Sequence, residues 1–262
     1  RAQIQLNRYK LADSLLKKAL KVNPAFAETF LYIGTLKGKQ SDHDDALEYL
    51  NRAIELDPKL TDAYKERAGI FLNLKDYLRA EIDLGAAANI DPSDSEIFSM
   101  RGLTFFRRML FDAAIQDFSP VLDGLPDDSK ALYNRAVCYI KKDEPALALN
   151  DLDKLIRVAP DNGRAFNLRG VVYTMMGKLD QALSDFETSL KLTPSDPGIW
   201  NNIGFFRFKA GNYAGAREDF QQALKLDPNF QFSKANLSYA NDRISATSDV
   251  DRDIHEKQEK TN

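Results

Sequence analysis

Apolar residues along most of the chain recur at intervals of three and four, which is the spacing of one face of an α-helix. Polar turns interrupt this pattern regularly, so it predicts pairs of amphipathic helices of roughly a dozen residues each. Segments such as KLD and AGNY supply the turn within a pair. A DP or NP dipeptide ends many second helices, because proline has no N–H to donate and disfavours helical geometry in the residue before it. The predicted fold class is all-α.

The helix pairs recur with one fixed period. Seven prolines follow one another at a spacing of 34 residues: Pro24, Pro58, Pro92, Pro126, Pro160, Pro194 and Pro228. An alanine stands twelve residues before each of them: Ala12, Ala46, Ala80, Ala114, Ala148, Ala182 and Ala216. A constant period of this length indicates a solenoid, in which each unit buries its apolar face against its neighbours.

With each of these prolines counted as position 32, two further positions have a constant size. Position 8 is always small: Gly34, Ala68, Gly102, Ala136, Gly170, Gly204 and Ser238. Position 24 is always large and apolar: Leu16, Leu50, Leu84, Phe118, Leu152, Phe186 and Phe220. We therefore expect the two helices of each repeat to approach closely at position 8, with the large side chain filling the space beside it.

One repeat matches a known pattern closely. The motif W-x2-L-G-x2-Y, A-x3-F, A, P is met by Trp200, Ile203, Gly204, Ala216, Phe220, Ala223 and Pro228. The chain thus resembles the tetratricopeptide repeat family, and the resemblance implies a right-handed superhelical solenoid of helix-turn-helix repeats. The expected divisions are a partial repeat 1–26, full repeats 27–60, 61–94, 95–128, 129–162, 163–196 and 197–230, a capping helix 231–245 and a polar, mobile tail 246–262.

Charged residues and one proline depart from the family pattern. Position 7 is arginine and position 23 is aspartate in the same four repeats: Arg67, Arg101, Arg135 and Arg169, with Asp83, Asp117, Asp151 and Asp185. We predict that each arginine pairs with an aspartate across the two helices, its own or a neighbour's. Lys37 and Arg207 stand at position 11, usually aromatic, which predicts weaker packing there. Pro120 lies inside a second helix and predicts a kink or an early end.

Charge and composition limit the classes of function. The net charge of −3 comes from mixed acidic and basic residues, so no global field would recruit nucleic acid or an anionic membrane. No apolar run reaches the roughly 18 residues of a membrane-spanning helix, so direct membrane insertion is not expected. Only His43, His255 and Cys138 offer imidazole or thiol groups, and no phosphate-binding GxxxxGK loop occurs. We expect no catalysis, no metal and no cofactor.

The face of each first helix that packing does not use comprises positions 2, 5, 6, 9, 12 and 13; we call it the first-helix stripe. The resemblance implies that this stripe lines a concave groove that holds a protein or peptide. The predicted binding residues on it are Arg107, Lys130, Tyr133, Asn134, Val137, Lys141, Arg164, Asn167, Leu168, Asn201, Asn202, Phe205, Phe208 and Lys209. The asparagines suit a peptide backbone because a carboxamide both donates and accepts. Alternatively, the apolar members pack on the next repeat.

Three functional hypotheses follow. The first is a scaffold or adaptor that binds a peptide; the second is a regulatory or targeting module of a larger enzyme; the third is self-assembly into a homo-oligomer. The two-carboxylate clamp of some family members is rejected, because the repeat with Lys65 has Gly69 where asparagine is required. Since the first residue is Arg1 and not methionine, we expect that an N-terminal segment was removed. Partner and compartment, cytoplasm or periplasm, stay open.

Overall fold

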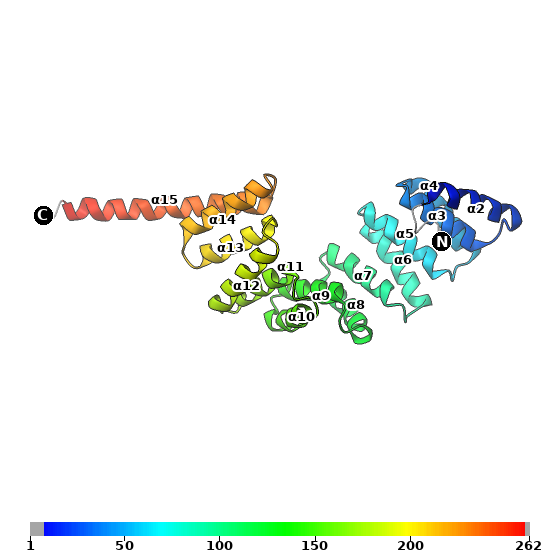
Figure 1. Ribbon diagram of the computed structural model, residues 1–262, viewed down its shortest axis with the longest axis horizontal. Helices are drawn as coiled ribbons and strands as arrows, with labels where there is room; N and C mark the ends of the chain where they lie inside the picture. The colour runs from blue at the N-terminus through cyan, green and yellow to red at the C-terminus, as the bar shows by residue number, and fades with distance from the viewer. Residues whose placement is uncertain (1–7, 260–262) are drawn as a thin grey trace. The chain divides into compact units, whose positions relative to one another are not determined.

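A computed structural model describes residues 8–259, with side chains up to residue 246. The first seven residues of the expected partial repeat and residues 260–262 of the expected tail lie outside the described residues. Within the described range the chain forms fourteen α-helices and no strand (Figure 1). Complete first helices have 13 residues and second helices 14. Two compact units divide the chain, residues 1–138 and 139–262.

Both units are built from helix pairs. The first unit contains α2 (Tyr9–Val22), α3 (Ala27–Lys39), α4 (His43–Leu56), α5 (Thr61–Asn73), α6 (Tyr77–Ile90), α7 (Ser95–Arg107), α8 (Phe111–Gly124) and most of α9 (Ser129–Lys141). The second contains α10 (Pro145–Val158), α11 (Gly163–Met175), α12 (Leu179–Leu192), α13 (Pro197–Lys209), α14 (Tyr213–Leu226) and α15 (Gln231–Glu259). Within each unit the two helices of a pair pack together, and a second helix also packs on the first helix that follows it, as α12 does on α11 and α13.

The turn within each pair uses one residue in the left-handed conformation. It always falls at position 15: Ser41, Lys75, Met109, Asp143, Gly177 and Gly211, with φ between 59° and 81°. Only two of the six are glycine, the residue that adopts a positive φ without steric penalty. The sequence placed the turn correctly, although four of these side chains do not favour its geometry.

The link to the next repeat closes with an Asx turn in four places, as at Asp57. The backbone N–H of Asp57 donates to the Ala53 carbonyl at 2.9 Å and so completes α4. Its side-chain oxygen accepts from the backbone N–H of Lys59 at 2.9 Å, across Pro58. The proline therefore ends the second helix as predicted, and the residue before it satisfies a donor of the link.

Close approach at position 8 is confirmed. A Cβ added to Gly170 would lie 2.7 Å from the ring of Phe186, and one added to Gly204 would lie 2.6 Å from the ring of Phe220. The Phe186 and Phe220 side chains are almost completely buried. Phe186 and Phe220 thus rest directly on the backbone of their own first helices, which is the core contact of these repeats.

The predicted arginine–aspartate pairs form in three repeats, each with the aspartate of its own repeat. The donors Nε and Nη2 bind both carboxylate oxygens, at 2.8 and 2.6 Å for Arg67–Asp83, 2.8 and 2.7 Å for Arg101–Asp117, and 2.7 and 2.8 Å for Arg169–Asp185. These bonds raise the pKa of Arg67, Arg101 and Arg169 above the ordinary range. The pair Arg135–Asp151 stays a prediction, since its members belong to different units.

The third nitrogen of the guanidinium makes a contact that the sequence analysis missed. Nη1 donates to position 25 of the preceding repeat: from Arg67 to Asn51 at 2.6 Å, from Arg135 to Ser119 at 3.1 Å, and from Arg169 to Asp153 at 2.8 Å. The arginine at position 7 therefore links the second helix of its own repeat to the second helix of the preceding repeat, as Arg67 and Arg169 do. For Arg101 the equivalent residue is Gly85, which has no side chain to accept.

The basic residues at position 11 bind aspartates, which the sequence did not predict; the weaker packing expected there stays a prediction. Arg207 Nη1 donates to both carboxylate oxygens of Asp219, at 2.7 and 2.8 Å, one helical turn from the usual arginine position. Burial raises the pKa of Asp219 to about 6, although Arg207 acts in the opposite direction. Lys37 in turn donates to Asp42 at 2.8 Å and to Asp45 at 2.5 Å.

Two helix boundaries differ from the prediction. Helix α8 does not end early at Pro120 and has the length of the other second helices, because proline removes only one backbone donor and buried Phe118 and Val121 hold the helix in place. No helix end occurs at residue 245, where the cap was expected to give way to the tail; α15 is continuous to Glu259. The sequence after residue 230 contains neither proline nor glycine to stop it.

Candidate functional site

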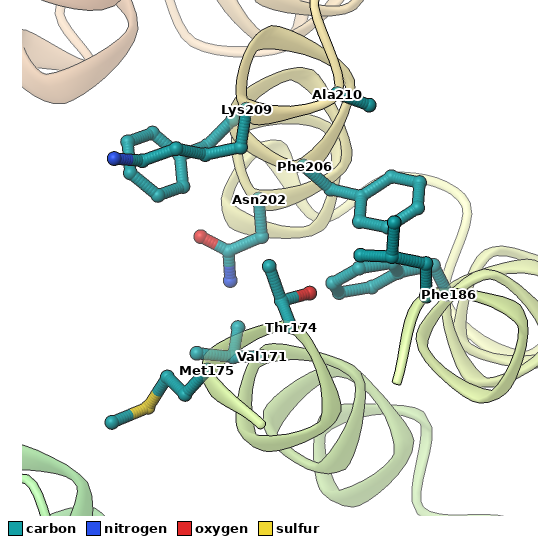
Figure 2. A pocket seen from close by; sticks show the side chains of 10 residues that line it. Val171, Thr174, Met175, Phe186, Asn202, Phe206, Lys209 and Ala210 are labelled. Atoms are coloured by element: carbon teal, nitrogen blue, oxygen red, sulfur yellow. The ribbon is translucent and has the colours of Figure 1, made fainter. Parts of the chain in front are cut away.

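The second unit has a pocket of about 570 Å³ between α11, α12 and α13, which we call the Phe186 pocket. Its lining is Val171, Thr174, Met175, Leu179, Phe186, Asn202, Phe205, Phe206, Lys209 and Ala210. Figure 2 shows the carboxamide of Asn202 pointing from α13 toward α11, where Val171 and Thr174 lie. Most of these residues belong to the first-helix stripe, which two successive repeats bring together here.

A second pocket, of about 360 Å³, lies one repeat further along, between α13, α14 and α15. We call it the Phe220 pocket; it is lined by Phe205, Phe208, Phe220, Asn236, Tyr239, Asp242 and Arg243. Phe205 contributes to both pockets and forms the wall between them. The same repeat positions recur, since Phe220 is the counterpart of Phe186 and Asn236 that of Asn202.

Polar groups stand at the edge of the Phe186 pocket. Asn202 Nδ2 donates to Asn167 Oδ1 at 3.2 Å, so two asparagines of successive repeats are joined. Within the described part of the chain the amide nitrogen of Asn167 has no acceptor in return. Lys209 Nζ lies 5.4 Å from the centroid of the Phe205 ring and makes no ion pair with any described residue. These amide and ammonium groups remain available for a ligand.

Asn201 has a different role from its neighbour Asn202. Its side chain is 9 % exposed, and its carboxamide oxygen accepts from Ser233 Oγ and from Asn236 Nδ2, both at 3.0 Å. These bonds join α13 to α15. Asn201 therefore holds the last two first helices together and does not face the pockets.

The first unit also has pockets along the first-helix stripe, and their linings are more polar than those of the second unit. One of about 460 Å³ lies between α7, α8 and α9, and its lining includes Leu103, Phe118, Lys130 and Asn134. Another, of about 180 Å³, surrounds Lys65. Burial opposes the charge of Lys65, but hydrogen bonds to Asp94, Glu96 and Asp62 outweigh it and raise the pKa of the amine. Its ammonium group is thus already occupied by carboxylates.

The pockets bring together only part of the predicted binding set. Six of its members line a pocket: Lys130, Asn134, Asn202, Phe205, Phe208 and Lys209. Asn167 lies at the edge of the Phe186 pocket, where it is hydrogen-bonded to Asn202. Arg164 forms an ion pair with Asp196 at 3.3 Å. Arg107 and Lys141 are exposed at the ends of their helices. Tyr133, Val137 and Leu168 are half-buried and line none of the four pockets described.

Several residues that line the pockets lie outside the predicted binding set. Thr174, Met175, Tyr239 and Arg243 belong to the pockets but were not among the predicted binding residues. They occupy positions 12, 13, 9 and 13 of their repeats. All four belong to the first-helix stripe, so they would have been predicted if positions 9, 12 and 13 had been included in every first helix and in α15.

Thiol and metal-ligating groups are the side chains of the described residues most relevant to catalytic chemistry. Cys138 is buried, and burial raises the pKa of its thiol to about 12, so the thiolate nucleophile is disfavoured. No group of three or more His, Cys, Asp or Glu side chains in the described part of the chain is arranged to hold a metal ion. Among the same residues, none of the helices has the length and apolar character needed to cross a bilayer.

Comparison with known proteins finds the same repeat. Sequence patterns described as tetratricopeptide repeat match residues 1–26, 31–95, 139–197 and 197–230. A solved tetratricopeptide repeat protein from Parabacteroides merdae aligns with a TM-score of 0.66 at 21% identity, over 91% of this chain and 94% of that one. At this identity the likeness concerns the fold alone.

Two curated relatives match over short segments. The Sol locus transcriptional repressor of Clostridium acetobutylicum is 38% identical over 73 residues, 28% of this chain and 23% of that protein. The UDP-N-acetylglucosamine–peptide N-acetylglucosaminyltransferase of Giardia intestinalis is 31% identical over 77 residues, 29% of this chain and 5% of that protein. The chain thus matches less than a quarter of the length of either relative.

Proposed function

The chain belongs to the tetratricopeptide repeat family, and on this premise we propose that it is a non-catalytic scaffold that binds a peptide or protein segment along the first-helix stripe. Proteins of this family bind other proteins or peptides. The two pockets of the second unit are the site that we assign to the ligand.

One observation carries the proposal: two apolar pockets of about 570 and 360 Å³ share the wall formed by Phe205. Concave, mostly apolar sites with a few polar groups at the edge are typical of ligand binding. Each pocket has room for a large apolar side chain of a ligand, and its burial supplies the affinity. The rings of Phe186 and Phe220 form the floors and are fixed by the glycines of the core contact.

The polar edge supports a peptide in particular. The Asn167 amide has a free donor, and Asn202 holds that side chain in place. Carboxamides bind the backbone of any extended peptide, whatever its side chains. Lys209 adds a preference for a carboxylate, because its ammonium group has no acidic partner among the described residues.

Selection from a library of displayed random 12-residue peptides tests this function. Peptides enriched on the whole chain are synthesised, and their affinity is measured by fluorescence anisotropy. We expect Phe205→Ala to weaken binding about tenfold or more, since it removes the wall of both pockets. Asn202→Ala should weaken it less, and Leu147→Ala, exposed on α10 away from both pockets, should leave it unchanged.

Two results would contradict the proposal: no peptide is enriched, or the enriched peptides bind Phe205→Ala as tightly as the unaltered chain. Circular dichroism of each variant checks that the helices are intact. Asn201 is not a suitable test residue, because its side chain holds α13 and α15 together and its loss would disturb the fold.

A second candidate function is a regulatory or targeting module of a larger enzyme. It is favoured by the enzyme relative from Giardia intestinalis, in which the matched segment is 5% of the protein. The complete product of the gene decides between the two functions. A catalytic domain on the same polypeptide would support the module, and a product made only of repeats would contradict it.

A further inference from the structure

The Phe186 and Phe220 pockets are two copies of one site. Position 9 supplies Val171, Phe205 and Tyr239 in three successive first helices, and position 24 supplies the two phenylalanines that form the floors. The contacts between α11 and α13, and between α13 and α15, show that these first helices are neighbours. A ligand that fills both pockets must therefore present two similar side chains at the spacing of adjacent helices.

That spacing selects a backbone conformation. Packed helices lie about 8–10 Å apart. In a β-strand, side chains on the same face recur about every 6.6 Å, which is too short, and at twice that distance, which is too long. In a polyproline II helix the side chains of residues i and i+3 point the same way and lie about 9.3 Å apart. Of these two extended conformations, only the polyproline II helix matches the distance from one pocket to the next.

The polar edge leads to the same conformation. A polyproline II segment makes no internal hydrogen bonds, so its carbonyl and N–H groups are free for the Asn167 amide and for Asn236. An α-helical ligand could also space two side chains by about 10 Å, at i and i+7, but its backbone groups are bonded internally. The asparagines would then have no backbone partner.

We propose that the ligand of the second unit is a polyproline II segment with two large apolar side chains three residues apart, which occupy the Phe186 and Phe220 pockets. The inference rests on the proposed function. The two residues between the anchors pass over Phe205, where Lys209 lies 5.4 Å from the ring centroid. An acidic residue at one of these two places pairs with the lysine, which gives the pattern Φ-x-x-Φ with a carboxylate inside it.

Short fluorescein-labelled peptides with two leucines at different spacings test the proposal. The probes are GSLPELSG, with leucines at i and i+3, and the variants GSLPLEGS and GSLPEPLG, with leucines at i+2 and i+4. Anisotropy titrations with the whole chain should give an affinity about tenfold higher for the i+3 peptide, because the other two can bury only one leucine. The analogue GSLGELSG should bind more weakly, since glycine lowers the population of the extended conformer.

Matched variants locate the effect. Phe205→Ala should abolish the advantage of the i+3 peptide, and Leu147→Ala should change nothing. Lys209→Gln should lower the affinity for GSLPELSG but not for GSLPQLSG, in which glutamine replaces the glutamate. Equal or tighter binding of the i+2 or i+4 peptide overturns the proposal, as does an absence of binding by all of them. The random-peptide selection shows separately whether the site binds peptides: enriched sequences without the i+3 spacing defeat this inference alone, and no enrichment defeats the proposed function as well.

Discussion

At the scale of single residues, the contact between positions 8 and 24 follows a rule of size. Phenylalanine at position 24 always faces glycine, as Phe186 faces Gly170, whereas alanine at position 8 faces leucine, as Ala68 faces Leu84. The ring reaches so far over the first helix that a Cβ would lie at 2.7 Å from it. Leu84 is shorter and leaves room for the methyl group of Ala68. Leucine does not do so in every repeat, since a Cβ added to Gly34 would lie 2.6 Å from Leu50.

This rule makes a prediction for Gly170→Ala. The added methyl group meets the Phe186 ring, so the free energy of unfolding should fall by about 1–2 kcal/mol, even though alanine favours a helix. Adding Phe186→Leu to the same chain should recover most of the loss, as the Ala68–Leu84 pair indicates. Urea unfolding followed by circular dichroism measures both.

The same substitution at Gly69 is the control, because a Cβ there meets nothing within 4 Å. Gly69→Ala should stabilise the chain by up to about 1 kcal/mol through helix propensity alone. If Gly170→Ala were as stabilising as Gly69→Ala, the close contact would have no energetic role.

At the scale of helices, the arginine at position 7 links the second helices of successive repeats by hydrogen bonds. One guanidinium binds the aspartate of its own second helix and a polar side chain on the second helix before it, as Arg169 binds Asp185 and Asp153. The series is interrupted once, at Arg101, whose Nη1 faces the position of Gly85. The junction between α6 and α8 therefore lacks the bond that Arg67 makes between α4 and α6 and that Arg169 makes between α10 and α12.

Gly85→Asn should restore this bond. Asparagine at the equivalent position accepts from Arg67 at 2.6 Å, and an added Cβ at Gly85 meets nothing within 4 Å. Gly85→Ala is the control, because it raises helix propensity without adding a hydrogen-bond acceptor. Helix propensity alone favours alanine over asparagine by about 0.6 kcal/mol. We expect Asn to stabilise at least as much as Ala, because the new bond contributes about 1 kcal/mol. An advantage of Ala equal to the full propensity difference would show that no bond forms.

At the scale of the whole molecule, stability is distributed over neighbouring repeats. Within each unit a helix packs on the helices next to it in sequence, and some first helices also pack on the first helices of neighbouring repeats, as α13 does on α11 and α15. Such a chain has no single central core, and its free energy is close to a sum of terms for repeats and their interfaces. Local opening should therefore differ along the chain.

Hydrogen exchange measured by mass spectrometry should show this gradient in the second unit. Amides of α12 and α13, which have neighbours on both sides, should exchange most slowly. The part of α15 beyond residue 245 should exchange fastest, because its sequence offers almost no apolar side chains to bury. Equal protection along α15 would contradict the expectation that this segment is mobile.

Much of the fold could be predicted because the chain repeats. The seven prolines set the period, and the constant pairing of a small residue at position 8 with a large one at position 24 predicted the core contact. The bidentate pairs of Arg67, Arg101 and Arg169 were predicted as well, since both partners occur together in the same repeats. Signals that recur at a constant spacing are readable from sequence because the same local geometry returns each time.

The tertiary structure decided what does not recur. Asn201 and Asn202 are adjacent and alike in sequence, yet one is buried against α15 and the other lines a pocket, because they lie about 100° apart around the helix axis. Arg207 reaches Asp219 from an unexpected position because the two helices are packed at that turn. The sequence alone determined the repeat, its helices and the stripe on which a ligand could bind. Packing between particular side chains determined which residues of that stripe remain free to bind one.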